Sequence, residues 1–394
     1  MDPVWLLLLL PLAAAGGWYM AMNERNRPTR PTRSRDLPES YFKGLSFLLN
    51  EQPDKALQVF LEVVEVDKET VEMHLALGNL FRRLGEVGRA TRIHQNLVAR
   101  TDLDDSLRSM ALFELGQDYF KAGLFDRAEN LFQELRQVAE YREQTCRFLL
   151  QIYDQEKEWK NAIQIAEELD RFSEQGYSAT IAHYNCELAE GAIAEGNNQI
   201  AEGYLESAFK KDMRCVRAII LSGRIASMKG NHAHAIVIWR GLERWAPEAI
   251  GEVVGHVANS YRQLGDEKSL VRFLESSLKK NSDPRIIAKL VQLTGQKQGH
   301  AAEQARLLEL VRKYPNLESL SQLMSNRSRD PDASRQGKDI SILAGMLSDV
   351  VEAGKSYNCS QCGFQSNALH WQCPGCKGWE TIRRQSGVKL ATHP

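Results

Sequence analysis

Residues 110–135 read MALFELGQDYFKAGLFDRAENLFQEL, and their spacing of small and large residues predicts two antiparallel helices. Gly116 and Ala128 are small, which lets the two helices approach closely. Tyr119 and Phe132 are large enough to fill the space against a neighbouring pair. One such pair cannot bury its apolar face alone, so further pairs must stack against it.

The same spacing recurs along most of the chain. Gly44 and Gly78 are 34 residues apart, which is the period of the tetratricopeptide repeat. Glycine marks most turns between the paired helices, whereas Lys157 takes this position in the fourth unit. We therefore predict an all-α solenoid over residues 39–324, with a degenerate last unit at 286–314. The alternative, a single all-helical globule, does not explain so regular a spacing.

Composition places the chain among folded proteins. Of its 394 residues, 43% are hydrophobic and 26% are charged, and the length exceeds what one core usually supports. The formal net charge is −1, which gives no overall attraction to nucleic acid. A disordered chain and a generally basic nucleic-acid-binding protein are therefore both disfavoured.

The N-terminal segment, residues 1–22, has the properties of a transmembrane anchor. Residues 4–22 carry no charge, and a helix of this length at about 1.5 Å per residue nearly spans a hydrocarbon core of about 30 Å. Five arginines follow in the proline-rich tether at 23–38, and by the positive-inside rule they hold the downstream chain in the cytoplasm. The alternative is a cleaved signal peptide, but no basic residue precedes the apolar run.

The concave surface of a solenoid is formed by the first helix of each pair and is where partners usually dock. In the repeat frame these positions are polar or basic, which suits an acidic or peptide-like partner. Exposed helix surfaces are polar in any case, so the pattern also fits a plain solvent-facing surface. The predicted partner-binding residues are Asn79, Arg82, Arg83, Gln117, Lys121, Arg217, Arg224, Asn259 and Arg262.

A linker and a short helix are predicted at residues 325–354. The repeat pattern stops after Tyr314, and residues 325–337 are rich in Ser, Arg, Asp and Pro. The helix at 340–351 is expected to pack between the solenoid and the C-terminal segment. Its apolar face is formed by Ile340, Leu343, Leu347 and Val350.

The C-terminal segment, residues 355–394, carries the clearest chemical motif. Two Cys-x2-Cys pairs are separated by ten residues, and each pair can form a turn whose sulfurs bind a metal at about 2.3 Å. Four thiolates form a closed tetrahedral site for zinc or iron and leave no open position for catalysis. A disulfide pairing would require an oxidising compartment, which the expected topology argues against. The predicted ligands of one metal ion are Cys359, Cys362, Cys373 and Cys376.

No catalytic motif accompanies the metal site. The chain contains no HExxH, GxSxG or GxGxxG sequence. The remaining cysteines, Cys146, Cys186 and Cys215, lie far apart inside expected helices and are predicted to be small core residues. We therefore expect that the protein is not an enzyme.

The metal motif resembles a shortened rubredoxin-type domain. The residues that carry this resemblance are Cys359, Cys362, Gly363, Phe364, Trp371, Cys373, Pro374, Cys376 and Trp379. Combined with the anchor, the tether and the repeat array, the chain resembles the lipopolysaccharide assembly protein B family of Gram-negative bacteria over essentially its whole length.

This resemblance implies a single-pass inner-membrane adaptor with a periplasmic N-terminus and a cytoplasmic body. In that family the adaptor presents the deacetylase of early lipid A synthesis to a membrane AAA+ metalloprotease, and it also meets an inner-membrane lipopolysaccharide sensor. Only the four cysteines carry over residue by residue, because several repeats are degenerate. Nucleic acid is not expected as a partner, and a homodimer is compatible with the sequence.

Two other functions use the same features. A zinc ribbon associated with nucleic acid would combine basic and aromatic side chains. Those available are Lys377, Arg383, Arg384, Lys389, Trp371 and Trp379. A bound iron would permit one-electron transfer, although no flavin or dinucleotide motif is present. The favoured hypothesis is a membrane-tethered scaffold that raises the effective concentration of two partners.

Overall fold

The computed structural model describes residues 15, 17–20, 22, 42–44, 46–47, 52–61, 68–172, 176–328, 336–354 and 356–384. The chain divides into two compact units, residues 1–128 and 129–394. The predicted tether and most of the predicted anchor lie outside the described residues. Within the described part of the chain, no helix is both long and apolar enough to span a bilayer.

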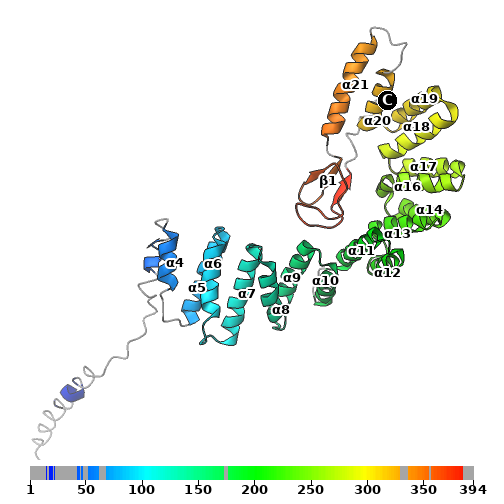
Figure 1. Cartoon of the computed structure of the whole chain (residues 1–394). Helices are drawn as coiled ribbons and strands as arrows, with labels where there is room; N and C mark the ends of the chain where they lie inside the picture. The colour runs from blue at the N-terminus through cyan, green and yellow to red at the C-terminus, as the bar shows by residue number, and fades with distance from the viewer. Residues whose placement is uncertain are drawn as a thin grey trace, which may run out of the picture. The chain divides into compact units, whose positions relative to one another are not determined.

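The first unit consists of stacked helices (Figure 1). They are α4 (Pro53–Leu61), α5 (Lys68–Arg83), α6 (Val87–Val98), α7 (Asp105–Lys121) and the beginning of α8 (Phe125–Leu135). Leu77 and Phe81 of α5 form one core cluster with Ala90 and Ile93 of α6. The predicted helix pairs therefore form as the spacing of small and large residues requires.

The second unit continues this arrangement. Its helices are α9 (Arg142–Glu156), α10 (Trp159–Phe172), α11 (Ser178–Ala194), α12 (Asn198–Lys211), α13 (Val216–Met228), α14 (His232–Arg240), α15 (Leu242–Trp245), the 3-10 helix Pro247–Ala249, α16 (Ile250–Gln263), α17 (Glu267–Lys280), α18 (Pro284–Gln298), α19 (His300–Lys313) and α20 (Leu317–Ser328). One core cluster runs from Ile219 in α13 to Leu323 in α20. Neighbouring pairs therefore share a continuous core, as stacked repeats require.

Small residues in the first helix of a pair admit large side chains from the second. A Cβ atom at Gly78 of α5 would lie 2.3 Å from Nε2 of His94 in α6. A Cβ atom at Gly223 of α13 would lie 2.2 Å from Nε1 of Trp239 in α14. Trp239 is fully buried and donates its Nε1–H to the carbonyl oxygen of Ile220 at 3.2 Å. Close helix approach therefore explains the glycine positions.

The turns between paired helices follow the glycine pattern with one exception. The glycines Gly85, Gly123, Gly196, Gly230 and Gly265 have φ values between 68° and 85°. Lys157, which occupies this position in the fourth unit, has φ 59°. A lysine therefore adopts the left-handed conformation that glycine adopts in the other units, at some cost in backbone energy.

The predicted short helix differs from expectation. It is α21 (Gln336–Ala353), which packs against α20, and α20 itself ends at Ser328, inside the predicted linker. Of the predicted apolar face, Leu343 and Val350 are 55% and 57% exposed, so these two side chains do not pack as their spacing predicted. Ala344 is buried instead.

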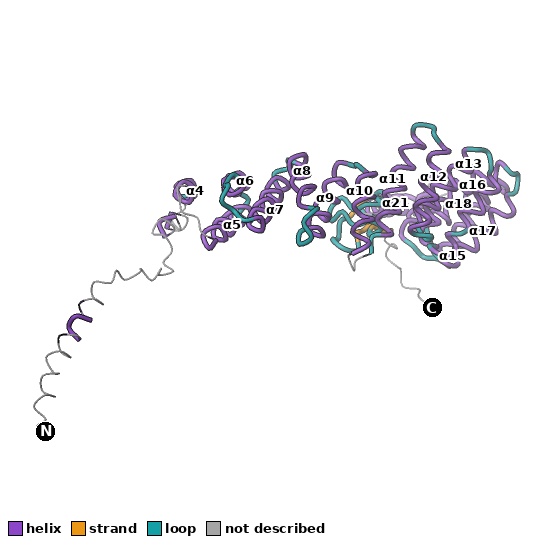
Figure 2. The backbone as a smooth tube through the Cα atoms, turned by 90° about the horizontal axis from the view of Figure 1, so that it is seen from below, coloured by secondary structure: helices purple, strands orange, loops and turns teal. Residues whose placement is uncertain are grey.

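The C-terminal metal domain is the part of the described chain that contains strands. They are β1 (Tyr357–Cys359), β2 (Gln365–Ser366) and β3 (Ile382–Arg384), coloured orange in Figure 2. The antiparallel order is β2-β1-β3. Its core cluster contains Tyr357, Cys359, Cys373 and Ile382, which is a small core for an independent fold.

Candidate metal centre

Two similar turns position the four cysteines. In the first turn, the amide of Gly363 donates to the carbonyl oxygen of Cys359 at 3.1 Å. In the second, the amide of Lys377 donates to the carbonyl oxygen of Cys373 at 2.8 Å. Gly363 and Lys377 have φ values of 75° and 60°. Both turns therefore require a left-handed residue directly after their second cysteine.

The first cysteine of each turn is also fixed through its own amide. The amide of Cys359 donates to the carbonyl oxygen of Phe364 at 2.8 Å, and that of Cys373 donates to Gly378 at 2.9 Å. A Cβ atom at Gly375 would lie 3.2 Å from Sγ of Cys362. Glycine at this position therefore leaves the sulfur its space.

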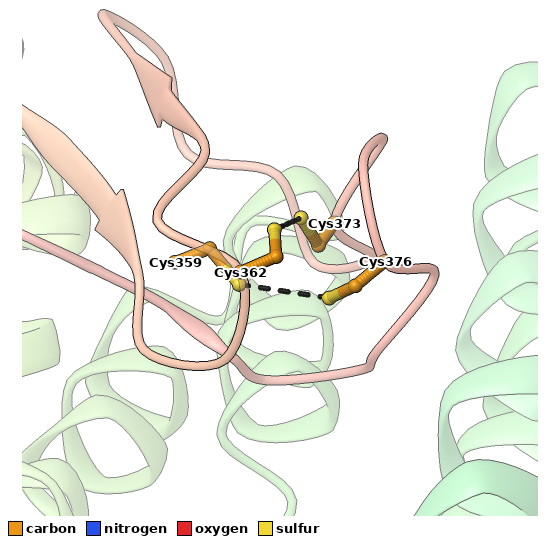
Figure 3. Close-up of side chains that lie close together, drawn as sticks. All are labelled: Cys359, Cys362, Cys373 and Cys376. Atoms are coloured by element: carbon orange, nitrogen blue, oxygen red, sulfur yellow. Dashed lines mark hydrogen bonds between the residues drawn. The ribbon is translucent and has the colours of Figure 1, made fainter.

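The four sulfur atoms converge on one point, as Figure 3 shows. Sγ of Cys359 lies 3.7 Å from Sγ of Cys376, and Sγ of Cys362 lies 3.6 Å from Sγ of Cys373. All four sulfurs lie within 4.8 Å of one another. Ligands bound at about 2.3 Å in a tetrahedron are about 3.8 Å apart, so the donor set fits zinc or iron.

The cysteines differ in their acidity. Hydrogen bonding with Thr381, whose Oγ1 lies 3.3 Å from Sγ of Cys359, and the nearby amide of Cys362 lower the pKa of Cys359 to about 6. The amide of Phe364 favours the thiolate of Cys362, but desolvation and the neighbouring sulfurs raise the pKa of Cys362 to about 11. Crowded thiolates repel one another, and a bound cation would offset this repulsion.

Trp379 packs the metal domain against the solenoid. Its ring stacks on His183 of α11 with a centroid distance of 4.9 Å. It also makes edge contacts with Tyr184 of α11 at 5.7 Å and with Trp159 of α10 at 6.4 Å. Aromatic contacts of this kind stabilise beyond the area they bury.

Polar contacts extend this docking along the second unit. Gln372 donates Nε2–H to Oδ2 of Asp154 in α9 at 2.6 Å. Arg384 pairs with Glu318 of α20 at 2.7 Å. In Figure 1, the metal domain lies on the inner side of the arc of helices from α9 to α20. The small domain therefore bridges the two ends of this unit.

Burial raises the pKa values of two groups in this interface. Burial raises the pKa of Asp154, and its hydrogen bond with Gln372 only partly opposes this shift. Burial and a hydrogen bond to Glu252 of α16 raise the pKa of Tyr357. The Tyr357 hydroxyl donates to Oε1 of Glu252 at 2.8 Å. Both contacts therefore involve groups that are drawn out of water when the metal domain docks.

A cavity of about 480 Å³ lies beside this interface. Its walls come from the metal domain and from the starts of α16, α18 and α20, and they include Glu248, Glu318, Tyr357, Trp371 and Arg383. Acidic, basic and aromatic groups are all present in the lining, so it does not select one charge class of ligand.

Two of the predicted partner-binding arginines are committed to internal contacts. Arg217 is 3% exposed and pairs with Glu187 at 2.7 Å, while its guanidinium lies 6.0 Å from the ring of Trp371. Arg82 pairs with Glu114 at 2.5 Å and with other groups of the first unit. The exposed members of the predicted set are Arg83, Lys121, Asn259 and Arg262, and the half-buried ones are Asn79, Gln117 and Arg224.

The sequence did not predict that these residues dock the metal domain on the solenoid. Trp379 and Arg384, which the nucleic-acid alternative requires, contact the solenoid instead. Lys389 lies outside the described residues. Cys146, Cys186 and Cys215 are buried, as predicted for core residues. His183 was missed, because a lone histidine within a helical pattern resembles any core residue.

Comparison with known proteins agrees with both modules. The family described as "Rubredoxin metal binding domain" matches residues 357–384, and the family "Tetratricopeptide repeat" matches residues 43–102. These matches confirm the type of repeat and the type of metal domain. The positions of the four cysteines fit a metal-binding domain of this type, and this set of donors suits both iron and zinc.

Whole-length relatives are also found. "Lipopolysaccharide assembly protein B" of Escherichia coli K12 is 34% identical over 383 residues, which covers 97% of this chain and 98% of the relative. The protein of that name from Haemophilus influenzae is 32% identical over 387 residues, with 96% of this chain and 97% of the relative covered.

Among solved structures, a chain in "Structure of Naa15/Naa10 bound to HypK-THB" is 13% identical, with 78% of this chain and 46% of that chain covered and a TM-score of 0.44.

Proposed function

The chain belongs to the lipopolysaccharide assembly protein B family, and from this premise we propose that it serves lipopolysaccharide assembly as a membrane-associated adaptor without catalytic activity. The observation that carries the proposal is the similarity over 97% of the chain, which includes the repeats and the metal domain together. Stacked helix pairs provide extended surfaces for proteins, and a closed four-thiolate site has no open position for a substrate.

In the proposed mechanism, the adaptor brings the deacetylase of lipid A synthesis to a membrane AAA+ metalloprotease. An N-terminal anchor at residues 1–22 would confine the complex to the inner membrane, where an inner-membrane lipopolysaccharide sensor can meet it. Confinement raises the effective concentration of the two partners without any new contact. The role of the chain is thus to hold and orient proteins.

The first unit is the better candidate for the partner surface. Arg83 and Lys121 are exposed and form no ion pair with another described residue, and they end α5 and α7. Arg217, near the start of α13 in the second unit, is instead buried beneath the metal domain. We therefore assign partner binding to the first unit and a bracing role to the metal domain, which zinc or iron would cross-link through its four thiolates.

Cross-linked pull-down from membranes tests this proposal. The intact chain should recover a membrane metalloprotease together with the lipid A deacetylase. Arg83→Ala with Lys121→Ala should lower that recovery about tenfold, which corresponds to about 1.4 kcal/mol. The matched control is Arg92→Ala with Lys160→Ala, two exposed positions on the second helices of their pairs, and it should recover both partners.

Three results would contradict parts of this proposal. Recovery of RNA or ribosomal proteins in place of the two partners would favour the nucleic-acid alternative. Equal recovery by the Arg83/Lys121 variant and the intact chain would leave the adaptor function standing but remove the assigned surface. Deletion of residues 1–22 supplies a third comparison, because undiminished function of the shortened chain in cells would contradict membrane tethering.

A further inference from the structure

A second group of metal-binding side chains lies where the metal domain meets the solenoid. His183 of α11, Cys215 at the start of α13 and Glu380 of the metal domain place one ligand atom each within 4.8 Å of one another. His183 and Cys215 are buried, whereas Glu380 is exposed. This group is distinct from the four cysteines, which come from the metal domain alone.

The imidazole of His183 has unsatisfied nitrogen atoms. Its side chain is 1% exposed, and neither Nδ1 nor Nε2 forms a hydrogen bond with a described residue. Nε2 nevertheless lies 3.1 Å from Oε1 of Glu380. Buried polar atoms are almost always hydrogen-bonded. The close approach of Nε2 of His183 to Oε1 of Glu380 without a hydrogen bond therefore needs another explanation.

A shared metal ion explains this geometry. Nitrogen and oxygen ligands bound to zinc at about 2.0 Å in a tetrahedron are about 3.3 Å apart. The Nε2 to Oε1 distance between His183 and Glu380 is close to this value, while the two atoms lack the alignment of a hydrogen bond. An ion pair alone would use one nitrogen and would give no role to the nearby thiol of Cys215.

Cys186 lies beside this group. It follows His183 by one turn of α11, and its sulfur lies 3.9 Å from the sulfur of Cys215, but it is not among the ligand atoms that all lie within 4.8 Å of one another. The group itself combines a thiol, an imidazole and a carboxylate, and zinc accepts all three kinds of donor.

The surrounding structure orients these donors. Trp379 stacks on the ring of His183, with 16° between the ring planes. Glu380 has φ 54°, a left-handed conformation that is uncommon for a residue other than glycine. Its amide donates to the carbonyl oxygen of Trp371 at 2.9 Å. Strained backbone that is fixed in this way is typical of functional positions.

We propose that His183, Cys215 and Glu380 bind a second metal ion, with zinc favoured, at the junction between the metal domain and the solenoid. The ion cross-links α11, α13 and the metal domain. This site is independent of the partners proposed above, because its ligands are all within the chain.

Metal stoichiometry of the purified full-length chain in detergent tests this site. The chain is stripped with a chelator, reloaded with excess Zn²⁺, freed of unbound metal and measured by plasma mass spectrometry. We expect two zinc ions per intact chain and one per chain in His183→Gln and Cys215→Ser. Glutamine keeps the size and polarity of His183 but removes the imidazole. Cys146→Ser, a buried cysteine of α9 away from the cluster, should keep two.

A milder variant separates ligand loss from misfolding. Glu380 is exposed, so Glu380→Gln should fold, and it should weaken the binding of the second Zn²⁺ at least about tenfold in a chelator competition titration. Co²⁺ in place of Zn²⁺ should show a thiolate charge-transfer band that is weaker in Cys215→Ser than in the intact chain. One zinc ion per intact chain, or two in His183→Gln with unchanged affinity, would overturn the proposal.

Discussion

The solenoid and the metal domain are stabilised in opposite ways. In the solenoid, apolar side chains form a core that continues from pair to pair, so that each residue supports its neighbours. In the metal domain the core cluster has four members, and two of them, Cys359 and Cys373, are predicted metal ligands. From this difference we expect a substitution in the solenoid core to have a local effect, whereas loss of the metal site should unfold the whole metal domain.

The largest expected effect is the loss of the metal site. Cys359→Ser with Cys362→Ser should unfold residues 357–384, because metal binding contributes about 10–16 kcal/mol to the folding of such domains. Helical circular dichroism should persist, while the tryptophan fluorescence of Trp371 and Trp379 should shift towards that of exposed rings. Metal analysis and fluorescence check both points.

The control for this prediction is Cys146→Ser. Burial raises the pKa of Cys146 to about 12, and this residue of α9 lies outside both groups of candidate metal ligands. Its replacement should leave metal content unchanged. A Cys359/Cys362 variant that kept its metal and its native fluorescence would break the comparison between the two regions.

The second prediction concerns the junction between the regions. Trp379→Ala should weaken docking of the metal domain by about 2–3 kcal/mol, somewhat less than for a fully buried tryptophan, because the contacts with His183, Tyr184 and Trp159 are lost. Metal bound by the four cysteines should remain. Hydrogen exchange of residues 357–384 measures this effect, and unchanged protection would show that the polar contacts alone hold the domain.

The third prediction tests whether damage to the solenoid stays local. Gly223→Ala forces a Cβ atom against Trp239 and should destabilise the second unit by about 1–3 kcal/mol without release of metal. Gly191→Ala is the matched control, because a Cβ atom there meets no atom within 4 Å. It should stabilise by about 0.5–1 kcal/mol. Urea unfolding compares the two, and equal effects would refute the close-approach argument.

The smallest expected effect depends on pH. Burial raises the pKa of Asp154 above its unfolded value, so the folded state binds more protons between these two pKa values, and stability falls as pH rises through that window. Asp154→Asn should remove this slope and keep an acceptor for Gln372. Urea unfolding from pH 4 upward measures the slope, and an identical slope in the variant would assign it to other groups.

The repeat architecture was predictable because the residues that form each helix pair lie close together in the sequence. Gly223 and Trp239 show the rule, since a small residue in one helix faces a large one in the next. Lys157 shows that the position in the repeat, more than the residue type, sets the turn conformation. The cluster of four cysteines was predictable for the same reason, because each turn brings two of them together within a few residues.

The contacts between the two regions were not predictable. The repeat frame placed Arg217 on the inner side of the solenoid, but it gave no sign that Trp371 would lie over it. Leu343 was assigned to the packing face of its helix from its spacing, yet it is exposed and its neighbour Ala344 is buried. Such contacts depend on shape between distant segments, which no local period encodes.

The hydrogen bond between Gln372 and Asp154 joins residues 218 positions apart. A ribosome that adds 5–20 residues per second therefore needs about 10–40 s to make the second residue after the first. During this interval the repeats around α9 can already fold, while the segment that will cover them does not yet exist. A chaperone or partner present during translation thus meets an open inner surface that is closed once synthesis ends.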